Sequence, residues 1–123
     1  MKKILIVDDS PTMRRMVASA LQGLAAVIFE EASNGLEAVE ILARGGVDLM
    51  ILDLNMPDMH GLDVLRFVRS HRLYKSTPII VLTTKYDSES RHSAVTAGAT
   101  DYLTKPFEPR VLLQHVSQWV NPV

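Results

Sequence analysis

Three aspartates that directly follow short aliphatic runs constrain the fold of this 123-residue chain more than any other feature. Asp8 and Asp9 follow the run at 4–7, and Asp53 follows the run at 49–52. Apolar runs of this length, interleaved with amphipathic stretches, are typical of buried parallel strands. Ligands bind at the carboxyl ends of such strands, so we expect the three carboxylates to converge at one edge of a sheet.

Carboxylates brought this close repel each other, by about 4 kcal/mol per pair at about 4 Å and an effective dielectric of about 20. A cluster of this kind is therefore expected to hold a cation. The chain has no cysteine and no clustered histidines, so the site would offer only oxygen ligands. Oxygen ligands favour a hard ion, and the predicted cofactor is Mg²⁺.

The composition predicts one domain over residues 1–123. Thirteen basic and fourteen acidic residues give a formal net charge of −1, which indicates neither nucleic-acid nor membrane-surface binding. The apolar stretch after Lys3 is too short for a signal peptide, and no apolar run reaches membrane-spanning length. We expect a soluble, cytoplasmic protein that acts as a monomer.

Apolar runs and amphipathic stretches alternate five times along the chain. The predicted strands cover 3–7, 26–32, 49–52 and 79–82, with a fifth around Tyr102-Leu103, and the predicted helices begin near Pro11, Asn34, Leu62, Ser88 and Pro109. Such alternation with short loops implies right-handed crossovers and a parallel sheet covered on both faces. The predicted fold is therefore α/β, with a five-stranded doubly wound sheet.

The spacing of apolar residues predicts the buried face of each helix. These faces comprise Met13, Met16, Val17, Ala20, Leu21 and Leu24 in the first helix, Leu36, Val39 and Leu42 in the second, Leu62, Leu65 and Val68 in the third, and Leu112, Val116 and either Trp119 or Val120 in the last. Ser10 and Asn34 are the expected N-caps. The helix at 88–97 has few large apolar residues, mainly Val95, so we expect it to be held loosely.

Further polar residues follow the other predicted strands. Thr83 and Thr84 come after the fourth strand, and Lys105 comes after the fifth. Each of these residues, taken alone, has an ordinary structural role as a cap or turn residue. Their joint placement at strand ends along one rim favours a functional site.

The predicted site has the chemistry needed to capture a phosphoryl group. A carboxylate such as Asp53 can attack phosphorus to form an acyl phosphate, and the acid pair can hold a cation that neutralises the phosphoryl oxygens. Lys105 would supply a fixed positive charge, and Thr83 a hydroxyl donor.

At these positions the chain resembles, over its whole length, the receiver domains of two-component response regulators. The resemblance is carried by Asp8-Asp9, Asp53 followed by Met56-Pro57 and Gly61, Thr83, Ala97-Gly98-Ala99, Tyr102 and Lys105-Pro106-Phe107. Through Thr12-Met13-Arg14-Arg15 and Asn55-Met56-Pro57 it is most similar to the single-domain chemotaxis regulators. The flavodoxin-like strand order 2-1-3-4-5 is taken from this resemblance, because a chemotaxis regulator is itself a standard example of that order.

The resemblance implies that Asp53 accepts a phosphoryl group from a phosphohistidine of a sensor histidine kinase. It implies that Asp9 and Asp53 ligate Mg²⁺, that Asp8 does so directly or through water, and that the backbone carbonyl of Asn55 is a further ligand. A cis peptide before Pro106 would aim Lys105 at the phosphoryl group.

The same resemblance assigns switch roles to Thr83 and Tyr102, which would move towards the phosphoryl group and turn inward behind it. Thr84 stands where chemotaxis regulators have a smaller residue, which reduces the room for Tyr102. Asn55 and Lys85 are expected to help set the lifetime of the phosphorylated state.

Three functions from different classes follow. The first is a phosphorylation-controlled module whose helix 88–97, Tyr102 strand and last helix bind a target such as a flagellar motor switch protein. The second is a phosphorelay intermediate, or a receiver domain separated from a larger regulator. The third, a Mg²⁺ phosphatase, is disfavoured because Asn55 holds the place where such an enzyme needs a general acid. We therefore expect no enzymatic activity beyond self-catalysed phosphotransfer and dephosphorylation at Asp53.

Overall fold

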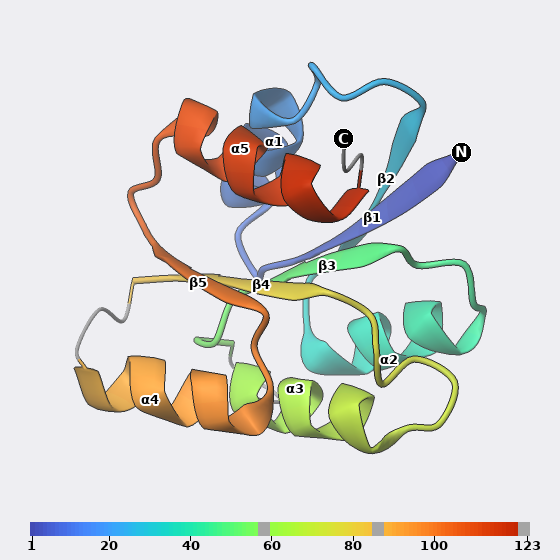
Figure 1. Ribbon diagram of the computed structural model, residues 1–123, viewed down its shortest axis with the longest axis vertical. Coiled ribbons are helices and arrows are strands. Elements are labelled where there is room, and N and C mark those ends of the chain that lie inside the picture. The colour runs from blue at the N-terminus through green and yellow to red at the C-terminus, as the bar shows by residue number, and fades with distance from the viewer. Residues whose placement is uncertain (57–59, 85–87, 121–123) are drawn as a thin grey trace.

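Strands and helices alternate along the chain in the computed structural model, which describes residues 1–56, 60–84 and 88–120 (Figure 1). The elements are β1 (Lys2–Val7), α1 (Pro11–Ala20), β2 (Val27–Ala32), α2 (Gly35–Ala43), β3 (Leu49–Leu52), α3 (Gly61–Ser70), β4 (Ile79–Thr83), α4 (Ser88–Ala97), β5 (Asp101–Thr104) and α5 (Pro109–Val120). The strand bounds predicted from the apolar runs are correct to within one residue. Within the described ranges, no helix is long and apolar enough to cross a membrane.

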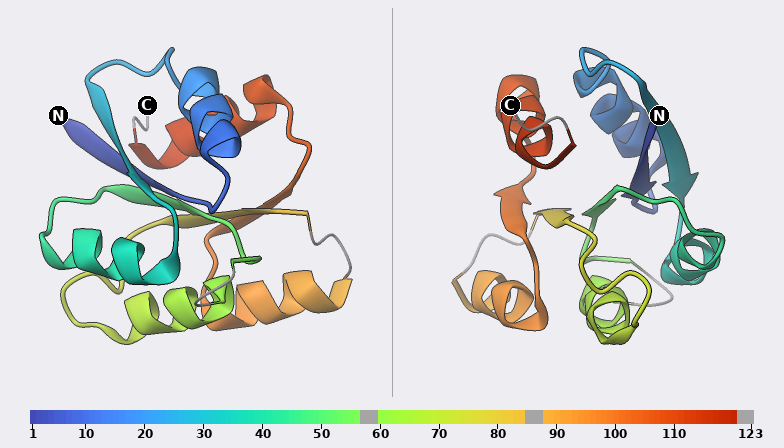
Figure 2. Two further views of the ribbon diagram at one scale, coloured as in Figure 1. Left: turned by 180° about the vertical axis from the view of Figure 1, so that it is seen from behind. Right: turned by 45° about the vertical axis from the view of Figure 1, so that its right-hand side comes forward.

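The strands form one parallel sheet in the order β2-β1-β3-β4-β5, which confirms the predicted architecture. Helices α1 and α5 cover one face of the sheet, and α2, α3 and α4 cover the other (Figures 1 and 2). β2 and β5 are the edge strands, so the three central strands are buried on both sides.

Alternation along each strand divides the core into two layers. On β1, Ile4 and Ile6 pack towards α1 and α5, whereas Leu5 and Val7 pack towards α2 and α3. The continuous apolar runs in the sequence therefore reflect a strand that is buried on both faces.

Three residues assigned to the buried helix faces are wrong, because Met16, Leu36 and Val95 are exposed. In α5 Val120 is buried and Trp119 is exposed, which decides between the two residues left open for that position. Helices α2 and α4 place their small side chains Ala38 and Ala94 against the core. Val95 lies about 100° around the helix from Ala94, and the close approach of the alanine leaves the larger valine in solvent. α4 has Ala94 as its buried residue, which agrees with the expectation of a loosely held helix.

Both predicted N-caps are confirmed. The Ser10 side chain accepts a hydrogen bond from the Met13 amide at 3.2 Å, with Pro11 at the first helical position. The Asn34 side chain accepts from the Glu37 amide at 2.8 Å. Local capping chemistry therefore fixes where these two helices begin.

Arg69 of α3 fastens the segment that joins α4 to β5. Its guanidinium donates to the carbonyl of Gly98 at 2.9 Å, to the carbonyl of Thr77 at 2.7 Å and to the hydroxyl of Thr100 at 3.3 Å. Gly98 has φ +111°, and a Cβ there would lie 2.7 Å from the Arg69 side chain. The C-terminal end of α4 is therefore anchored to α3, although the helix itself buries little apolar surface.

We predict that Gly61→Ala destabilises the protein by about 1 to 3 kcal/mol. A Cβ at Gly61 would lie 2.5 Å from the Asp53 carbonyl oxygen and 2.5 Å from Leu54 Cα, and these backbone atoms cannot move without disturbing the end of β3. Urea unfolding of the variant measures the loss.

Gly23→Ala is the matched control, because the nearest atom to its added Cβ is Leu113 Cδ2 at 3.9 Å. Its effect should stay within about 0.5 kcal/mol. Equal stability of the two variants would show that α3 can move away from β3 freely.

Candidate functional site

The register of the sheet brings the ends of its strands to one rim. Val7 of β1 pairs with Leu52 of β3, so the aspartates that follow them are neighbours. The Asp53 amide donates to the Val7 carbonyl at 3.0 Å, and the Lys105 amide donates to the Thr83 carbonyl at 2.8 Å. Backbone hydrogen bonds thus position three of the predicted site residues directly.

The three aspartates converge as expected. Carboxylate oxygens of Asp8, Asp9 and Asp53 all lie within 4.8 Å of one another. Asp8 and Asp53 are each only 4% exposed, whereas Asp9 is open to solvent. The cluster therefore has two oxygen ligands buried in the rim and one at its mouth.

Lys105 supplies a positively charged side chain to the site. Its ammonium lies 2.6 Å from Asp8 Oδ2 and 3.6 Å from Asp53 Oδ2, and its side chain is largely buried. The peptide between Lys105 and Pro106 is cis, as the family resemblance implies. One ammonium against three carboxylates leaves the site with excess negative charge.

Asp53 carries the main electrostatic cost. Burial raises the pKa of its carboxyl above the ordinary value of 3.8, and the neighbouring charges of Asp8 and Asp9 raise it further. The hydrogen bond from the Asn55 amide, at 3.2 Å, and the charge of Lys105 lower it. The raised pKa shows that these two partners do not fully offset the burial.

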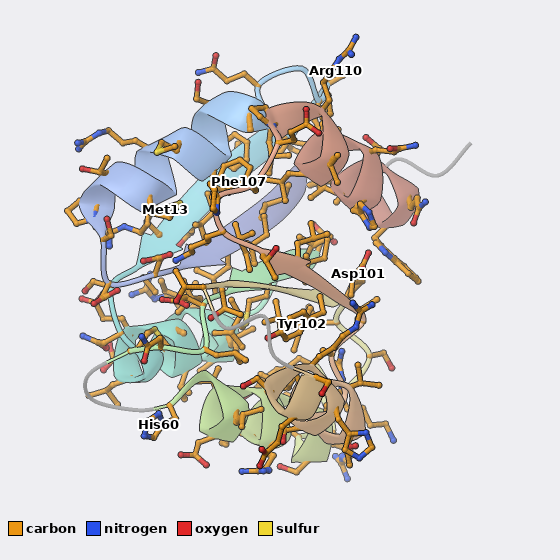
Figure 3. The ribbon with its side chains drawn as sticks, turned by 90° about the vertical axis from the view of Figure 1, so that its left-hand side faces the viewer. Met13, His60, Asp101, Tyr102, Phe107 and Arg110 are labelled. Atoms are coloured by element: carbon orange, nitrogen blue, oxygen red, sulfur yellow. The ribbon has the colours of Figure 1, made fainter. Side chains whose placement is uncertain are left out.

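Of the predicted switch residues, Thr83 ends β4, Thr84 follows it, and Tyr102 lies on β5. Thr83 is fully buried, and Thr84 is exposed. Tyr102 is 7% exposed and packs in the same core cluster as Ala94 of α4, with the guanidinium of Arg91 5.9 Å from its ring centroid. Figure 3 shows Tyr102 between β5 and α4. Thr84 therefore does not prevent Tyr102 from occupying an inward position.

The loop after β3 is partly described. The side chain of Asn55 is exposed, while its amide is held by Asp53. His60 precedes α3 at the outer edge of the molecule, without a side-chain capping bond (Figure 3). Pro57 and Lys85, which the resemblance includes, lie outside the described residues.

Arg14 is a site neighbour that the motif analysis did not assign a role. It donates through Nη1 to the Asp8 carbonyl at 2.6 Å and through Nε to Glu31 Oε1 at 2.7 Å. No local pattern links positions on different elements in this way. Its only sequence signal is the presence of Arg14 within the stretch at 12–15 that carries the resemblance.

The donor set suits a hard divalent cation. Its ligands are carboxylate oxygens within 4.8 Å of one another, and their excess negative charge would be neutralised by such an ion. An arrangement of this kind could bind a metal and hold a phosphoryl group between it and Lys105.

Comparison with known proteins identifies the class of protein that carries this rim. The family model of the response regulator receiver domain matches residues 4–117. The chain is 43% identical to the chemotaxis protein CheY1 of Helicobacter pylori over 89% of its length and 90% of the relative's. Among solved structures, the chemotaxis protein CheY4 of Vibrio cholerae superposes with a TM-score of 0.88 at 39% identity, covering 98% of this chain and 99% of that one. The Mn²⁺-bound response regulator Rcp1 superposes with a TM-score of 0.88 at 27% identity, covering 100% and 97%.

The chain belongs to the response regulator receiver domain family. Its relatives CheY1 of Helicobacter pylori and CheY4 of Vibrio cholerae are chemotaxis proteins.

We predict that Asp53→Asn stabilises the metal-free protein at neutral pH by about 1 kcal/mol. Because its pKa is raised above 3.8, Asp53 binds its proton more tightly in the folded protein than in the unfolded chain. Ionising Asp53 therefore costs stability, and this cost is absent below 3.8 and complete above the raised pKa. Urea unfolding with a chelator present should show a gain that narrows as the pH falls.

Asp63→Asn, on the exposed face of α3, removes the same charge away from the rim and should show no such pH-dependent gain. A free energy of unfolding lower for Asp53→Asn than for the parent at every pH measured would contradict the electrostatic account.

Proposed function

We propose that this receiver domain is phosphorylated on Asp53 by a sensor histidine kinase and thereby controls a chemotaxis output. The observation that carries the proposal is the placement of Asp53 Oδ2, which lies 3.6 Å from the Lys105 ammonium and inside the acidic cluster. The similarity to chemotaxis proteins over most of the chain supports the output.

In the proposed reaction, a carboxylate oxygen of Asp53 attacks the phosphorus of a phosphohistidine. The new P–O bond forms as the P–N bond breaks, and the imidazole leaves with the electron pair of that bond. Lys105 pairs with the transferred oxygens, and the Thr83 hydroxyl can donate to them. The product is an acyl phosphate whose charge is near −2 where the carboxylate had −1.

Asp8, Asp9, Asp53 and the backbone carbonyl of Asn55 would hold Mg²⁺, which supplies charge neutralisation for the phosphoryl oxygens. The fit rests on the all-oxygen cluster and on its uncompensated negative charge. That the related Rcp1 has been solved in a Mn²⁺-bound form supports the binding of a divalent cation by this chain. The chain would catalyse only phosphotransfer to, and loss from, its own aspartate.

The proposed output surface comprises α4, β5 and α5. α4 buries little apolar surface, so shifting it costs little free energy, but Arg69 anchors its C-terminal end. We infer that the N-terminal part of α4 and the neighbouring Tyr102 respond most strongly. A target such as a flagellar motor switch protein would bind the shifted arrangement and, by reciprocity, favour the phosphorylated form.

We predict that acetyl phosphate with Mg²⁺ adds a single phosphoryl group, at Asp53, because this carboxylate lies within reach of both the acid pair and Lys105. Intact-mass measurement should show the addition in the parent and in Asp63→Asn, and none in Asp53→Asn or without Mg²⁺. The same added mass on Asp53→Asn would show that the phosphoryl group goes elsewhere.

We also predict that beryllofluoride, a mimic of the phosphoryl group, changes amide exchange within residues 88–104. The change should be larger in the first turns of α4 than near Gly98, because Arg69 holds that end. Asp53→Asn is the control and should not respond. Changes confined to α1 and α2 would show that the output surface lies elsewhere.

A further inference from the structure

Arg14 connects three elements at the rim. It lies on α1, donates to the carbonyl of Asp8 at the end of β1, and pairs with Glu31 near the end of β2. Its side chain is 15% exposed, so the guanidinium is largely withdrawn from water. A planar guanidinium with fixed donor directions makes such a double contact more rigidly than a flexible ammonium can.

The contact bears on the turn that carries two of the three carboxylates. Asp8 donates its amide to the Ala32 carbonyl, accepts from the Ser10 amide at 2.9 Å, and pairs with Lys105. The bond from Arg14 holds its carbonyl, which is part of the peptide unit that leads into Asp9. The hydrogen bond from Arg14 therefore constrains the orientation of the peptide between Asp8 and Asp9.

Charge alone would make Arg14 unfavourable here, because a guanidinium near a cation site opposes cation binding. Glu31 offsets that charge at 2.7 Å and leaves the directional hydrogen bond to Asp8 in place. The Arg14–Glu31 pair thus orients the Asp8 carbonyl while adding little net charge near the carboxylates.

We propose that Arg14, held by Glu31, is a positioning residue that orients the Asp8-Asp9 turn for divalent cation binding. This inference rests on the proposed function, since it concerns the same metal site. Geometry and electrostatics predict opposite signs for its removal. Loss of a nearby positive charge should tighten cation binding, whereas loss of the positioning bond should weaken it.

The experiment is a Mg²⁺ titration by calorimetry of the parent, Arg14→Met, Arg14→Lys and Arg15→Met. We expect Arg14→Met to weaken Mg²⁺ binding about tenfold, the lower end of what loss of a supporting partner costs a metal site. Arg14→Lys keeps the charge but cannot reproduce the double contact, so its affinity should also fall. Arg15→Met removes an arginine from the adjacent position, where its contact is with the Thr12 hydroxyl at 3.5 Å, and should bind at least as tightly as the parent.

Two further measurements separate positioning from a general loss of structure. Urea unfolding without metal establishes that each variant is folded, and labelling with acetyl phosphate at saturating Mg²⁺ should return the Arg14 variants to the parental extent. Mg²⁺ affinities of both Arg14 variants equal to that of Arg15→Met would overturn the proposal, as would labelling that stays low at saturating Mg²⁺.

The outcome also separates this inference from the proposed function. If the parent binds Mg²⁺ and the Arg14 variants bind it more weakly, but the parent takes up no phosphoryl group, then the positioning role stands and the phosphoacceptor assignment fails. If the parent is labelled and the Arg14 variants bind Mg²⁺ as tightly as the parent, then the phosphoacceptor assignment stands and the positioning role of Arg14 fails.

Discussion

The ion pair between the Lys105 ammonium and the Asp8 carboxylate is the interaction on which the rim depends. Without Lys105, three carboxylates whose oxygens lie within 4.8 Å of one another would have no cationic side chain in contact with those oxygens, within the part of the chain that the structure describes. The pair is buried, so it is weakly screened by salt, and removing either partner would leave a charge in a site that water reaches poorly. The sheet supplies the positions, and this pair makes the concentration of like charge tolerable.

The site remains under-neutralised even with Lys105 in place, and this residual negative charge is what favours a divalent cation in the proposed function. A cluster whose charge was already compensated would attract a cation less strongly. The raised pKa of Asp53 has a related cause, because burial and the charges of Asp8 and Asp9 disfavour its ionised form. Stability is given up at Asp53, the residue to which the proposed function assigns the phosphoryl group.

The parts of the structure that depend on local chemistry were predictable. Strand bounds follow from apolar runs. Ser10 and Asn34 mark the beginnings of their helices, because the side chain of an N-cap binds an amide three residues further on. The convergence of the aspartates follows from parallel topology alone. The exposed positions of Leu36 and Val95 could not be predicted, because the sheet accepts the small alanines at closest approach and periodicity does not weigh side-chain size. The contacts of Arg14 and Arg69 were also hidden, since they join backbone carbonyls of other elements and leave no pattern in the sequence.

Asp8 and Lys105 are separated by 97 positions, and Lys105 follows the edge strand that is synthesised last. A nascent chain that ends after β4 would already contain all three aspartates but would lack their counter-charge. The rim is complete only when nearly the whole domain has been made and has closed its sheet. If the site receives a phosphoryl group as proposed, a chain truncated after β4 would hold the acceptor carboxylate without the ammonium that pairs with it, so the order of synthesis makes the proposed reaction depend on the finished sheet.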